Sequence, residues 1–576
     1  MKKLILLILI CFFISCNQDI KKSESIPSSS NSEIQKEVKK SVIVNKAMVV
    51  SAREEASKIG TEILKKGGNA FDAMIATELA LAVSYPIAGN IAGGGFMVYR
   101  TQHGEIGTLD YREKAPMGAS RDMYLDENGE FISDKSKEGS LAVGVPGTIA
   151  GIFAVHQKLG SLPIEEILEP VIALASNGYI VTKKQAERLS KYKETFLKVN
   201  DDVSIYTKKY NAGDTIINNA LANTLSRISQ NGRSEFYHGK TGKELVNYIQ
   251  SKDGIITMED LNAYEVEWRE PIVFKYKDLK IISMSPPSSG GICLAQILKS
   301  IEPYPIKSYG HNSIKTIQVI TEAERRAYAD RSFYLGDPDF VDIPVDTLIN
   351  KGYVTKRMND FTFDKATSSD SLSYGVIPGF ESSETTHYSI VDQFGNAIAV
   401  TTTLNGHFGS KLYAKDLGFF LNNEMDDFSA KPGTPNVYGL VGGEANSIQP
   451  QKRMLSSMTP TIVEKDGEFW MTVGTPGGST IITSVLQTIL NVYEFDMNMQ
   501  EAVDAPRFHH QWLPDVIRFE PNSFPKDSLN YLEEKGYIVE EKNSTVIGKV
   551  DGIRVLPNGK LEGGADRRGD DTAVGF

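Results

Sequence analysis

The sequence predicts an α+β protein. Segments in which apolar residues recur at helical spacing are mixed irregularly with short β-type apolar runs. The β-type runs form hairpin-like pairs rather than regular strand–helix–strand repeats, which favours layers of antiparallel sheet and helix. Hydrophobic residues make up 41% of the 576 residues, too many for a chain that is disordered throughout. Length alone would fit roughly three to five domains or one large enzyme fold.

The expected helices follow from apolar spacing and from residues that stop a helix. Apolar residues recur at helical spacing over 51–66, and Gly67 and Gly68 end the pattern. The next helix is expected over 72–84 and ends near Pro86. Further helices are expected over 164–176, 314–329 and 481–490.

Short runs of apolar and β-branched residues predict the strands. Three consecutive glycines, Gly93–Gly95, precede the first run. The expected strands cover 96–100, 281–284, 386–391, 397–403, 461–463 and 469–473.

The N-terminus, residues 1–15, has the layout of a secretory signal, with two lysines followed by an apolar run too short to span a bilayer. Cys16 follows directly in a pattern that resembles a bacterial lipobox, although Phe13 stands where Leu is usual. We therefore expect export to the cell envelope or periplasm and lipidation of Cys16. An ordinary cleaved signal with an incidental cysteine is the alternative. Residues 16–44, rich in Ser, Lys, Glu and Gln, are expected to be a flexible tether to the membrane.

Charge and cysteine content exclude several classes of protein. The formal net charge is −11 and no long basic run exists, which argues against binding to nucleic acid. Three cysteines cannot build a disulfide framework. If Cys11 leaves with the signal and Cys16 is acylated, Cys293 is the one thiol left. No later run of eighteen apolar residues exists, so we expect no transmembrane helix.

Several familiar motifs fail on spacing. Gly239-Lys240-Thr241 lacks the glycine spacing and the leading strand of a P-loop, and no serine has the G-x-S-x-G context. His509 and His510 are neighbours, so in an extended segment they point to opposite faces, and packing is expected for both. The acidic run at 424–427 lacks the glycine-spaced loop of a calcium site. We therefore expect no metal site.

The two runs 386–391 and 397–403 flank a Gly-containing turn and predict a hairpin. If Asp392 faces Ala397, Thr385 lies opposite Leu404, and a single bulge would bring it level with Thr403. A threonine hydroxyl needs a base, and a chain cut just before Thr385 would supply its own α-amine. On the hairpin alone, these threonines are better explained as ordinary strand residues.

Other segments favour a catalytic role. Gly477 and Gly478 join an apolar strand to a helix-like run, a junction whose backbone N–H groups can stabilise an oxyanion. Ser456 and Ser457 can donate to a carboxylate, and the acidic run at 424–427 can hold an ammonium group. Together these groups suit a substrate that carries both charges, such as an amino acid.

These residues stand in motifs that resemble the γ-glutamyltransferase family of N-terminal-nucleophile hydrolases, over nearly all of the chain from about Ala47 to Phe576. One departure is GNIAGGGF, where family members often read GIGGGGF. The matching motifs cover Gly67–Ala73, Ala92–Phe96, Leu109–Pro116, Ala142–Thr148, Pro286–Gly291, Ala327–Phe340, Thr385–Ser389, Leu421–Gly433, Leu455–Val463, Thr475–Ser479 and Ala505–Trp512.

The resemblance implies a four-layer αββα sandwich built from two fragments of one self-cleaved precursor, 45–384 and 385–576, which form a single joint domain. Cleavage would fall between Glu384 and Thr385. Thr385 would be the nucleophile and Thr403 its hydrogen-bond partner, and the backbone of Gly477 and Gly478 would form the oxyanion hole.

The resemblance also implies the substrate-binding residues. Arg112, Ser456 and Ser457 would hold the substrate α-carboxylate. Asn405, Glu424 and Asp427 would hold its α-ammonium group. Tyr438 lies in a Gly- and Pro-containing stretch that resembles the mobile lid of many bacterial members, with an ordinary surface loop as the alternative.

The implied activity is that of a γ-glutamyltransferase and glutathione hydrolase without a cofactor. The γ-glutamyl group of glutathione or a related compound would pass through an ester on Thr385 to water or to an amino-acid or peptide acceptor. Two alternatives remain: an acylase of the same superfamily that removes a different acyl group such as glutaryl, and a catalytically silent binding lipoprotein.

Overall fold

The computed structural model describes residues 41–372, 385–431, 443–541 and 546–576. Two seven-stranded sheets dominate the fold, and every strand pair in both is antiparallel. The first sheet has the order β1-β20-β19-β15-β14-β9-β8. Its strands are β1 (Val42–Val44), β8 (Ile272–Tyr276), β9 (Leu279–Ser283), β14 (Thr461–Lys465), β15 (Glu468–Gly474), β19 (Asp551–Val555) and β20 (Leu561–Ala565).

The second sheet has the order β21-β2-β10-β11-β3-β4-β7 and places the predicted hairpin at its centre. Its strands are β2 (Met48–Ser51), β3 (Gly94–Arg100), β4 (Ile106–Asp110), β7 (Glu267–Arg269), β10 (Thr386–Val391), β11 (Ala397–Thr403) and β21 (Thr572–Gly575).

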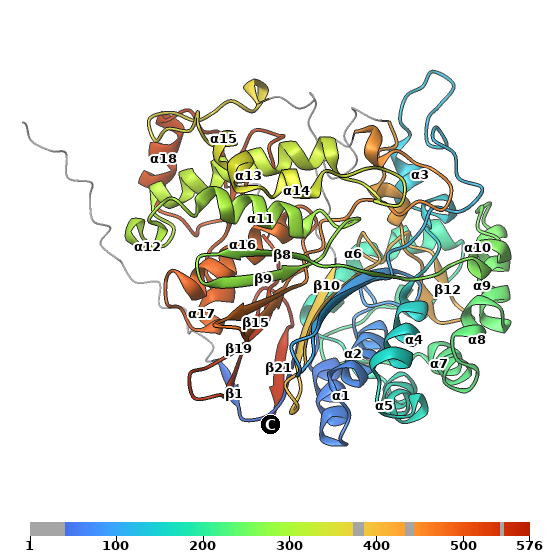
Figure 1. The fold of residues 1–576 in the computed structure, drawn as a ribbon. Coiled ribbons are helices and arrows are strands. Elements are labelled where there is room, and N and C mark those ends of the chain that lie inside the picture. The colour runs from blue at the N-terminus through green and yellow to red at the C-terminus, as the bar shows by residue number, and fades with distance from the viewer. Residues whose placement is uncertain (1–40, 373–384, 432–442, 542–545) are drawn as a thin grey trace, which may run out of the picture. The chain divides into compact units, whose positions relative to one another are not determined.

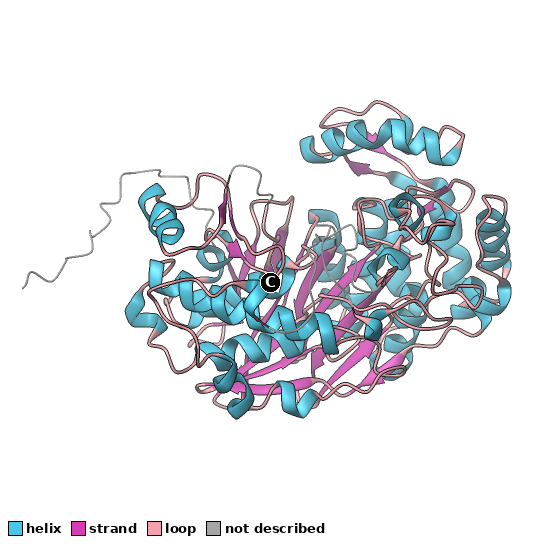
Figure 2. Ribbon diagram, turned by 90° about the horizontal axis from the view of Figure 1, so that it is seen from above, coloured by secondary structure: helices cyan, strands magenta, loops and turns pink. Residues whose placement is uncertain are grey.

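Helices cover the outer face of each sheet (Figure 1), and Figure 2 shows the same layers from above. The helices on the side of the first sheet are α11 (Gly290–Ile301), α13 (Ile314–Tyr334), α16 (Thr480–Tyr493) and α17 (Met499–Asp504). Those on the side of the second sheet are α1 (Glu54–Lys65), α2 (Ala70–Ser84), α4 (Thr148–Leu159), α5 (Ile164–Asn177) and α7 (Asn219–Asn231).

Smaller elements complete the described chain. The remaining α-helices are α3 (Ser133–Lys137), α6 (Lys183–Asn200), α8 (Arg233–Tyr237), α9 (Lys240–Gln250), α10 (Met258–Asn262), α12 (Ile306–Tyr309), α14 (Val345–Leu348), α15 (Lys351–Arg357) and α18 (Lys526–Glu534). The remaining strands are β5 (Tyr179–Ile180), β6 (Thr215–Ile216), β12 (Tyr413–Ala414), β13 (Phe419–Phe420), β16 (Phe508–His509), β17 (Ile517–Phe519) and β18 (Val539–Glu540).

Three hydrophobic layers hold the four structural layers together. One lies between the second sheet and its helices, a second between the first sheet and its helices, and a third between the two sheets. The third layer takes Val98 and Ala399 from one sheet and Ile282, Ile462 and Ile553 from the other. The predicted α+β class and the αββα arrangement are therefore confirmed.

Helix α2 shows how the sequence sets an element. The Asn69 side chain accepts from the backbone N–H of Phe71 and Asp72, and the Asp72 carboxylate accepts from the Asn69 N–H, which is a complete capping box. Every residue of α2 is buried, because the helix is covered both by the sheet and by other helices. The helix therefore starts two residues before the expected 72–84 and ends at Ser84, as predicted.

The N-terminal prediction needs one adjustment. Strand β1 pairs with β20, so the folded chain starts by Val42, inside the segment 16–44 that we expected to be a tether. The rest of that segment, the signal 1–15 and Cys16 lie outside the described residues. Within the part of the chain that the structure describes, no helix is both long and apolar enough to cross a membrane.

Candidate active site

The central hairpin brings the two predicted threonines together. Thr386 pairs directly with Thr402 at the end of the β10–β11 ladder. The same register, extended by one residue, sets Thr385 opposite Thr403, and both line one cavity. Thr385 is 6% exposed and Thr403 is 1% exposed, so the hydroxyls lie in a largely water-excluded place.

The expected register of this hairpin is wrong by one residue. Val391, not Asp392, pairs with Ala397. Asp392 lies in the turn, where its carboxylate accepts from the backbone N–H of Phe394 and Asn396, each at 2.9 Å. This side-chain-to-backbone turn adds one residue to the loop. Thr385 therefore reaches the level of Thr403 without the bulge that we had expected.

The cavity beside the hairpin gathers residues from widely separated segments. Among the predicted site residues, Gly477 adjoins the cavity through Gly478, and Tyr438 and Glu384 lie outside the described residues. The cavity is lined by Arg112, Thr385, Thr403, Asn405, Glu424, Asp427, Ser456, Ser457, Met458, Gly478 and Ile481.

Arg112 forms a buried ion triad with Glu424 and Asp427. Its Nη1 contacts Glu424 Oε1, and its Nη2 contacts Asp427 Oδ2. Burial raises the pKa of both carboxyls, and the guanidinium opposes that rise. Burial lowers the pKa of Arg112, but the two carboxylates outweigh it and leave that pKa above its usual value. The predicted carboxylate-binding and ammonium-binding groups are therefore in direct contact with one another.

Asn405 connects the threonine pair to the acidic run. Its backbone N–H donates to Thr403 Oγ1 at 2.7 Å, and its Nδ2 donates to the carbonyl of Asn423 at 3.0 Å. Asn405 has a φ of +68°, a conformation that Asn tolerates better than most residues. The acidic run starts at Glu424, directly after Asn423, so one short chain of bonds fixes the acidic groups relative to the hairpin.

One of the two serines, Ser457, is held by an arginine that was not among the predicted site residues. Arg331 of α13 donates from Nη2 to Ser457 Oγ at 3.0 Å and from Nε to Ser289 Oγ at 2.9 Å. Ser456 Oγ accepts from the Met458 N–H at 3.2 Å. Arg331 stands within one of the motifs that carried the resemblance, and that was the one signal for it in the sequence.

The Gly477–Gly478 turn joins β15 to α16, requires glycine at Gly477 and favours it at Gly478. Gly477 has a φ of +142° and Gly478 a φ of +57°. A Cβ on Gly477 would lie 2.4 Å from Thr480 Oγ1, closer than any real contact. The Thr480 N–H donates to the Gly477 carbonyl at 3.1 Å as α16 begins, so the turn sits at a helix N-terminus.

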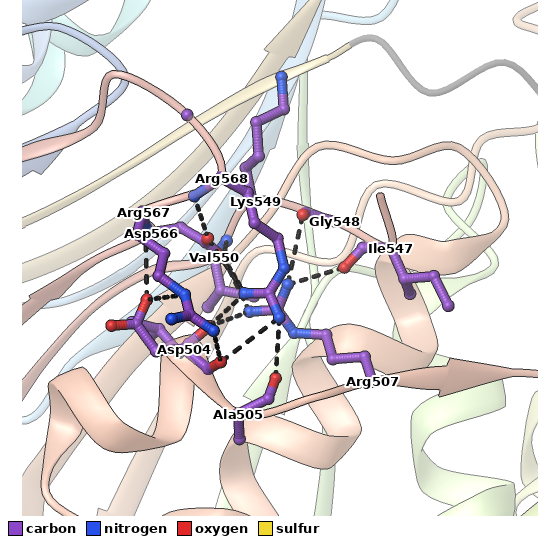
Figure 3. A network of polar contacts seen from close by, with 12 residues as sticks. Asp504, Ala505, Arg507, Ile547, Gly548, Lys549, Val550, Asp566, Arg567 and Arg568 are labelled. Carbon is purple, nitrogen blue, oxygen red and sulfur yellow. Dashed lines mark hydrogen bonds and ion pairs between the residues drawn. The ribbon is translucent and has the colours of Figure 1, made fainter. Parts of the chain in front are cut away.

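A polar network around Arg507 (Figure 3) is bonded to the segment that leads into this turn. Arg507 donates to the carbonyls of Ile547 and Gly548 at 2.7 and 3.2 Å, and to Asp566 at 2.8 Å. Lys549, which follows Gly548 in the chain, donates its backbone N–H to Thr475 Oγ1 at 2.8 Å. The network thus holds the loop 547–549 against the segment that leads into Gly477.

His387, two residues after Thr385 in the sequence, is unsuited to act as a general base. His387 is buried on the strand face that Thr385 shares, and its ring nitrogens lie 2.9 Å from Thr401 Oγ1 and 3.1 Å from Ser389 Oγ. Burial lowers the pKa of His387 to about 3. Because both ring nitrogens are hydrogen-bonded to strand hydroxyls and the pKa is low, His387 is a poor proton acceptor.

His509 and His510 are buried and pack against neighbouring side chains, as predicted. His509 Nδ1 lies 2.9 Å from Thr483 Oγ1, and His510 Nε2 lies 3.1 Å from Asp515. Within the described ranges, no group of three His, Cys, Asp or Glu side chains is arranged to hold a metal ion.

Comparison with known proteins places this site in a family. Residues 56–576 match the family described as Gamma-glutamyltranspeptidase. The chain is 45% identical over 548 residues to the glutathione hydrolase proenzyme of Escherichia coli K12, with 94% of each chain covered.

Solved structures of related proteins have the same fold as this chain. A γ-glutamyltranspeptidase from Helicobacter pylori is 44% identical, with a TM-score of 0.55 over 56% of this chain and 94% of that one. A cephalosporin acylase from Bacillus halodurans shares the fold, with a TM-score of 0.81 at 24% identity over 96% of this chain and 99% of that one. The chain belongs to the γ-glutamyltranspeptidase family.

Proposed function

We propose that the protein is a γ-glutamyltransferase and glutathione hydrolase that cuts itself between Glu384 and Thr385. The observation that carries the proposal is the single cavity in which Thr385 and Thr403 meet both a buried cation and buried carboxylates. The 45% identity to the E. coli glutathione hydrolase proenzyme supports the same activity.

Maturation starts with the Thr385 hydroxyl. Its oxygen bonds to the carbonyl carbon of Glu384, the peptide C–N bond breaks, and the Thr385 nitrogen takes up the proton. The resulting ester is hydrolysed by water, which leaves a carboxylate on Glu384 and restores the hydroxyl. The products are a large fragment that ends at Glu384 and the small fragment 385–576, which remain paired, and a free α-amine on Thr385.

The ion triad provides recognition of a zwitterion. A substrate α-carboxylate binds the guanidinium of Arg112, whose planar fork suits two parallel hydrogen bonds, and Ser456 and Ser457 donate to the same group. The substrate α-ammonium group binds Glu424, Asp427 and Asn405. The substrate thereby replaces the direct Arg112–carboxylate contacts with two opposite pairs, so no buried charge is left unpaired.

Catalysis then proceeds in two steps. The Thr385 α-amine, with a pKa near 7.7–8.0 for such a group, accepts the hydroxyl proton as the oxygen attacks the γ-amide carbon. The backbone N–H groups of Gly477 and Gly478 stabilise the oxyanion, the amide C–N bond breaks, and the amine leaves with the proton. Water or an acceptor amine attacks the ester in the same way. Thr385 supplies nucleophile and base, so the cycle needs no cofactor.

N-terminal sequencing of the small fragment tests the proposal. Purified wild-type protein should give two fragments on a denaturing gel, and the smaller should begin at Thr385. A different first residue would overturn the assignment of the nucleophile. Absence of both cleavage and turnover would support a silent binding protein instead.

An acylase for a different acyl group is the second candidate, because a cephalosporin acylase shares the fold. A glutaryl group has no α-ammonium, so it would leave Glu424 and Asp427 without the partner that a γ-glutamyl group brings. Release of aniline from γ-glutamyl anilide should therefore exceed release from glutaryl anilide. The reverse preference would favour the acylase.

We also propose that the chain is exported and anchored through a lipid on Cys16, and that Tyr438 contributes to substrate binding. The lipobox-like sequence supports the anchor, and the family resemblance supports the role of Tyr438. Mass spectrometry of the mature N-terminus tests the anchor. An unmodified first residue downstream of Cys16 would overturn it.

A further inference from the structure

A buried carboxyl lies behind the nucleophile hairpin and has no place in the mechanism above. Glu78 of α2 is fully buried, on the helix-covered face of the second sheet. Successive residues of a strand point to opposite faces, so Thr402 faces Glu78 whereas Thr403 faces the cavity. Glu78 therefore approaches the site from the far side of the sheet.

Each carboxylate oxygen of Glu78 holds one strand of the hairpin. The Tyr388 hydroxyl of β10 donates to Oε2 at 2.6 Å, and the Thr402 hydroxyl of β11 donates to Oε1 at 2.6 Å. Asn90 extends the network, because its Nδ2 lies 3.2 Å from Thr402 Oγ1 and donates to the Thr403 carbonyl at 2.9 Å. The carboxyl thus links the two strands through their side chains.

The link acts where the ladder ends. Thr402 pairs with Thr386, which directly follows Thr385, and it directly precedes Thr403. The last pair of a ladder lacks a further pair to hold it and is prone to fray. A side-chain link at this level restrains the separation of the two strands at the point where the reacting hydroxyl must be placed.

A structural role alone explains this carboxyl poorly. Burying an ionisable group without a cation partner costs free energy, and an apolar residue would fill the same space without that cost. Burial raises the pKa of Glu78 to about 7, although its two hydroxyl donors oppose the rise. Two titratable tyrosines, Tyr388 and Tyr111, lie beside Glu78, and Glu113 acts on Tyr111 from further away.

We propose that Glu78 is a positioning residue that sets the spacing of Thr385 and Thr403 from behind the sheet. The inference rests on the proposed function of Thr385. It predicts that Glu78 affects the chemical step and self-cleavage, and leaves substrate binding unchanged, because the ion triad of Arg112 lies on the other face of the sheet.

Two substitutions separate the link from the charge. Glu78→Leu removes both acceptors and puts an apolar side chain of similar size in their place. Glu78→Gln keeps one acceptor for Tyr388, and its amide can donate to Thr402, whose hydroxyl also lies 3.1 Å from the Gly94 carbonyl. Tyr388→Phe removes the hydrogen bond from β10 to Glu78 with little change in packing. This variant tests the inference if Glu78→Leu does not fold.

A matched control is Glu324→Gln in α13. Glu324 is also a fully buried carboxyl with a pKa raised by burial, and it accepts from the His510 backbone N–H at 3.0 Å. It belongs to the helices over the first sheet, away from the hairpin.

The assays are the rate of self-cleavage after purification and the steady-state hydrolysis of γ-glutamyl anilide. For Glu78→Leu we expect self-cleavage and kcat to fall about tenfold or more, with KM within about twofold of wild type, since misplacement of a reacting group lowers the rate of the chemical step. The self-cleavage rate and kcat of Tyr388→Phe should lie between those of Glu78→Leu and those of the wild type. Glu78→Gln and Glu324→Gln should stay within about threefold of wild type in both assays.

Three results would overturn the inference. The first is a kcat and a self-cleavage rate equal to wild type in both Glu78→Leu and Tyr388→Phe. The second is a change in KM alone, and the third is a loss of kcat and self-cleavage in Glu324→Gln as large as that in Glu78→Leu. Failure of the proposed function is distinguishable, because the wild-type protein itself would then neither cut itself nor release aniline.

Discussion

Replacing Glu78 with glutamine should change how the stability of the protein depends on pH. The folded-state pKa of Glu78 is about 7, against 4.5 for the free side chain, because the group is buried. Between these values the folded protein binds the proton more tightly than the unfolded chain. This contribution to the free energy of unfolding is therefore largest at acidic pH and is lost as the pH rises through about 7.

The magnitude follows from the two pKa values. Between pH 5 and pH 8, the contribution of Glu78 to the free energy of unfolding should fall by about 2.5 kcal/mol. Glutamine cannot ionise, so it lacks this dependence. The free energy of unfolding of Glu78→Gln minus that of the parent should therefore rise by about 2.5 kcal/mol over the same range.

The assay is urea unfolding of both proteins at a series of pH values, in a Thr385→Ala background that keeps the chain uncut and its unfolding unimolecular. All other titrating groups are common to the two proteins, so their contributions cancel in the difference. A difference that does not change with pH would show that Glu78 has an ordinary pKa. A difference that falls as the pH rises would mean that the hydroxyl donors outweigh burial.

Three further predictions concern the cavity. Thr385→Ala should leave one uncut chain on a denaturing gel and abolish release of aniline, and two fragments in that variant would exclude Thr385 as the nucleophile. Arg112→Lys should lower kcat/KM for γ-glutamyl anilide about a hundredfold, because a lysine cannot make two parallel bonds to a carboxylate or bridge Glu424 and Asp427; an unchanged kcat/KM would place the carboxylate elsewhere. Gly477→Ala should lower kcat about 10²- to 10³-fold, because the new Cβ clashes with Thr480 Oγ1 and shifts the N–H groups of the turn. In that variant, an unchanged kcat with a raised KM would show that the turn binds substrate instead.

The sequence predicted best the features that depend on neighbours along the chain. Both strands of the hairpin were predicted with the bounds that the structure has, because alternating apolar and β-branched residues flank a recognisable turn. The register was missed by one residue because the Asp392 side chain takes part in the turn, and a pattern of residue types does not reveal that bond. The αββα layering came from the family resemblance.

The supports of the site were missed because they join distant segments. Arg331 reaches Ser457 across 126 positions, and Arg507 reaches Asp566 across 59. Each is one arginine among many in the sequence, and nothing local distinguishes it. The resemblance gave the residues that line the cavity, whereas the residues that hold them in place needed the three-dimensional contacts.

Glu78 is different, because the sequence itself marks it as anomalous. It is a carboxyl in the middle of a largely apolar helix that is buried on every side, and such a conflict between local pattern and burial often marks a functional position. Its partners lie 310 and 324 residues away, so the sequence shows the conflict without its reason. If Glu78 served packing alone, leucine should leave kcat unchanged and could even stabilise the fold, because a buried ionisable group would be gone. A variant that is as stable as the parent yet slower in both self-cleavage and turnover would separate the two roles, because packing alone predicts no loss of rate in a protein that has kept its stability.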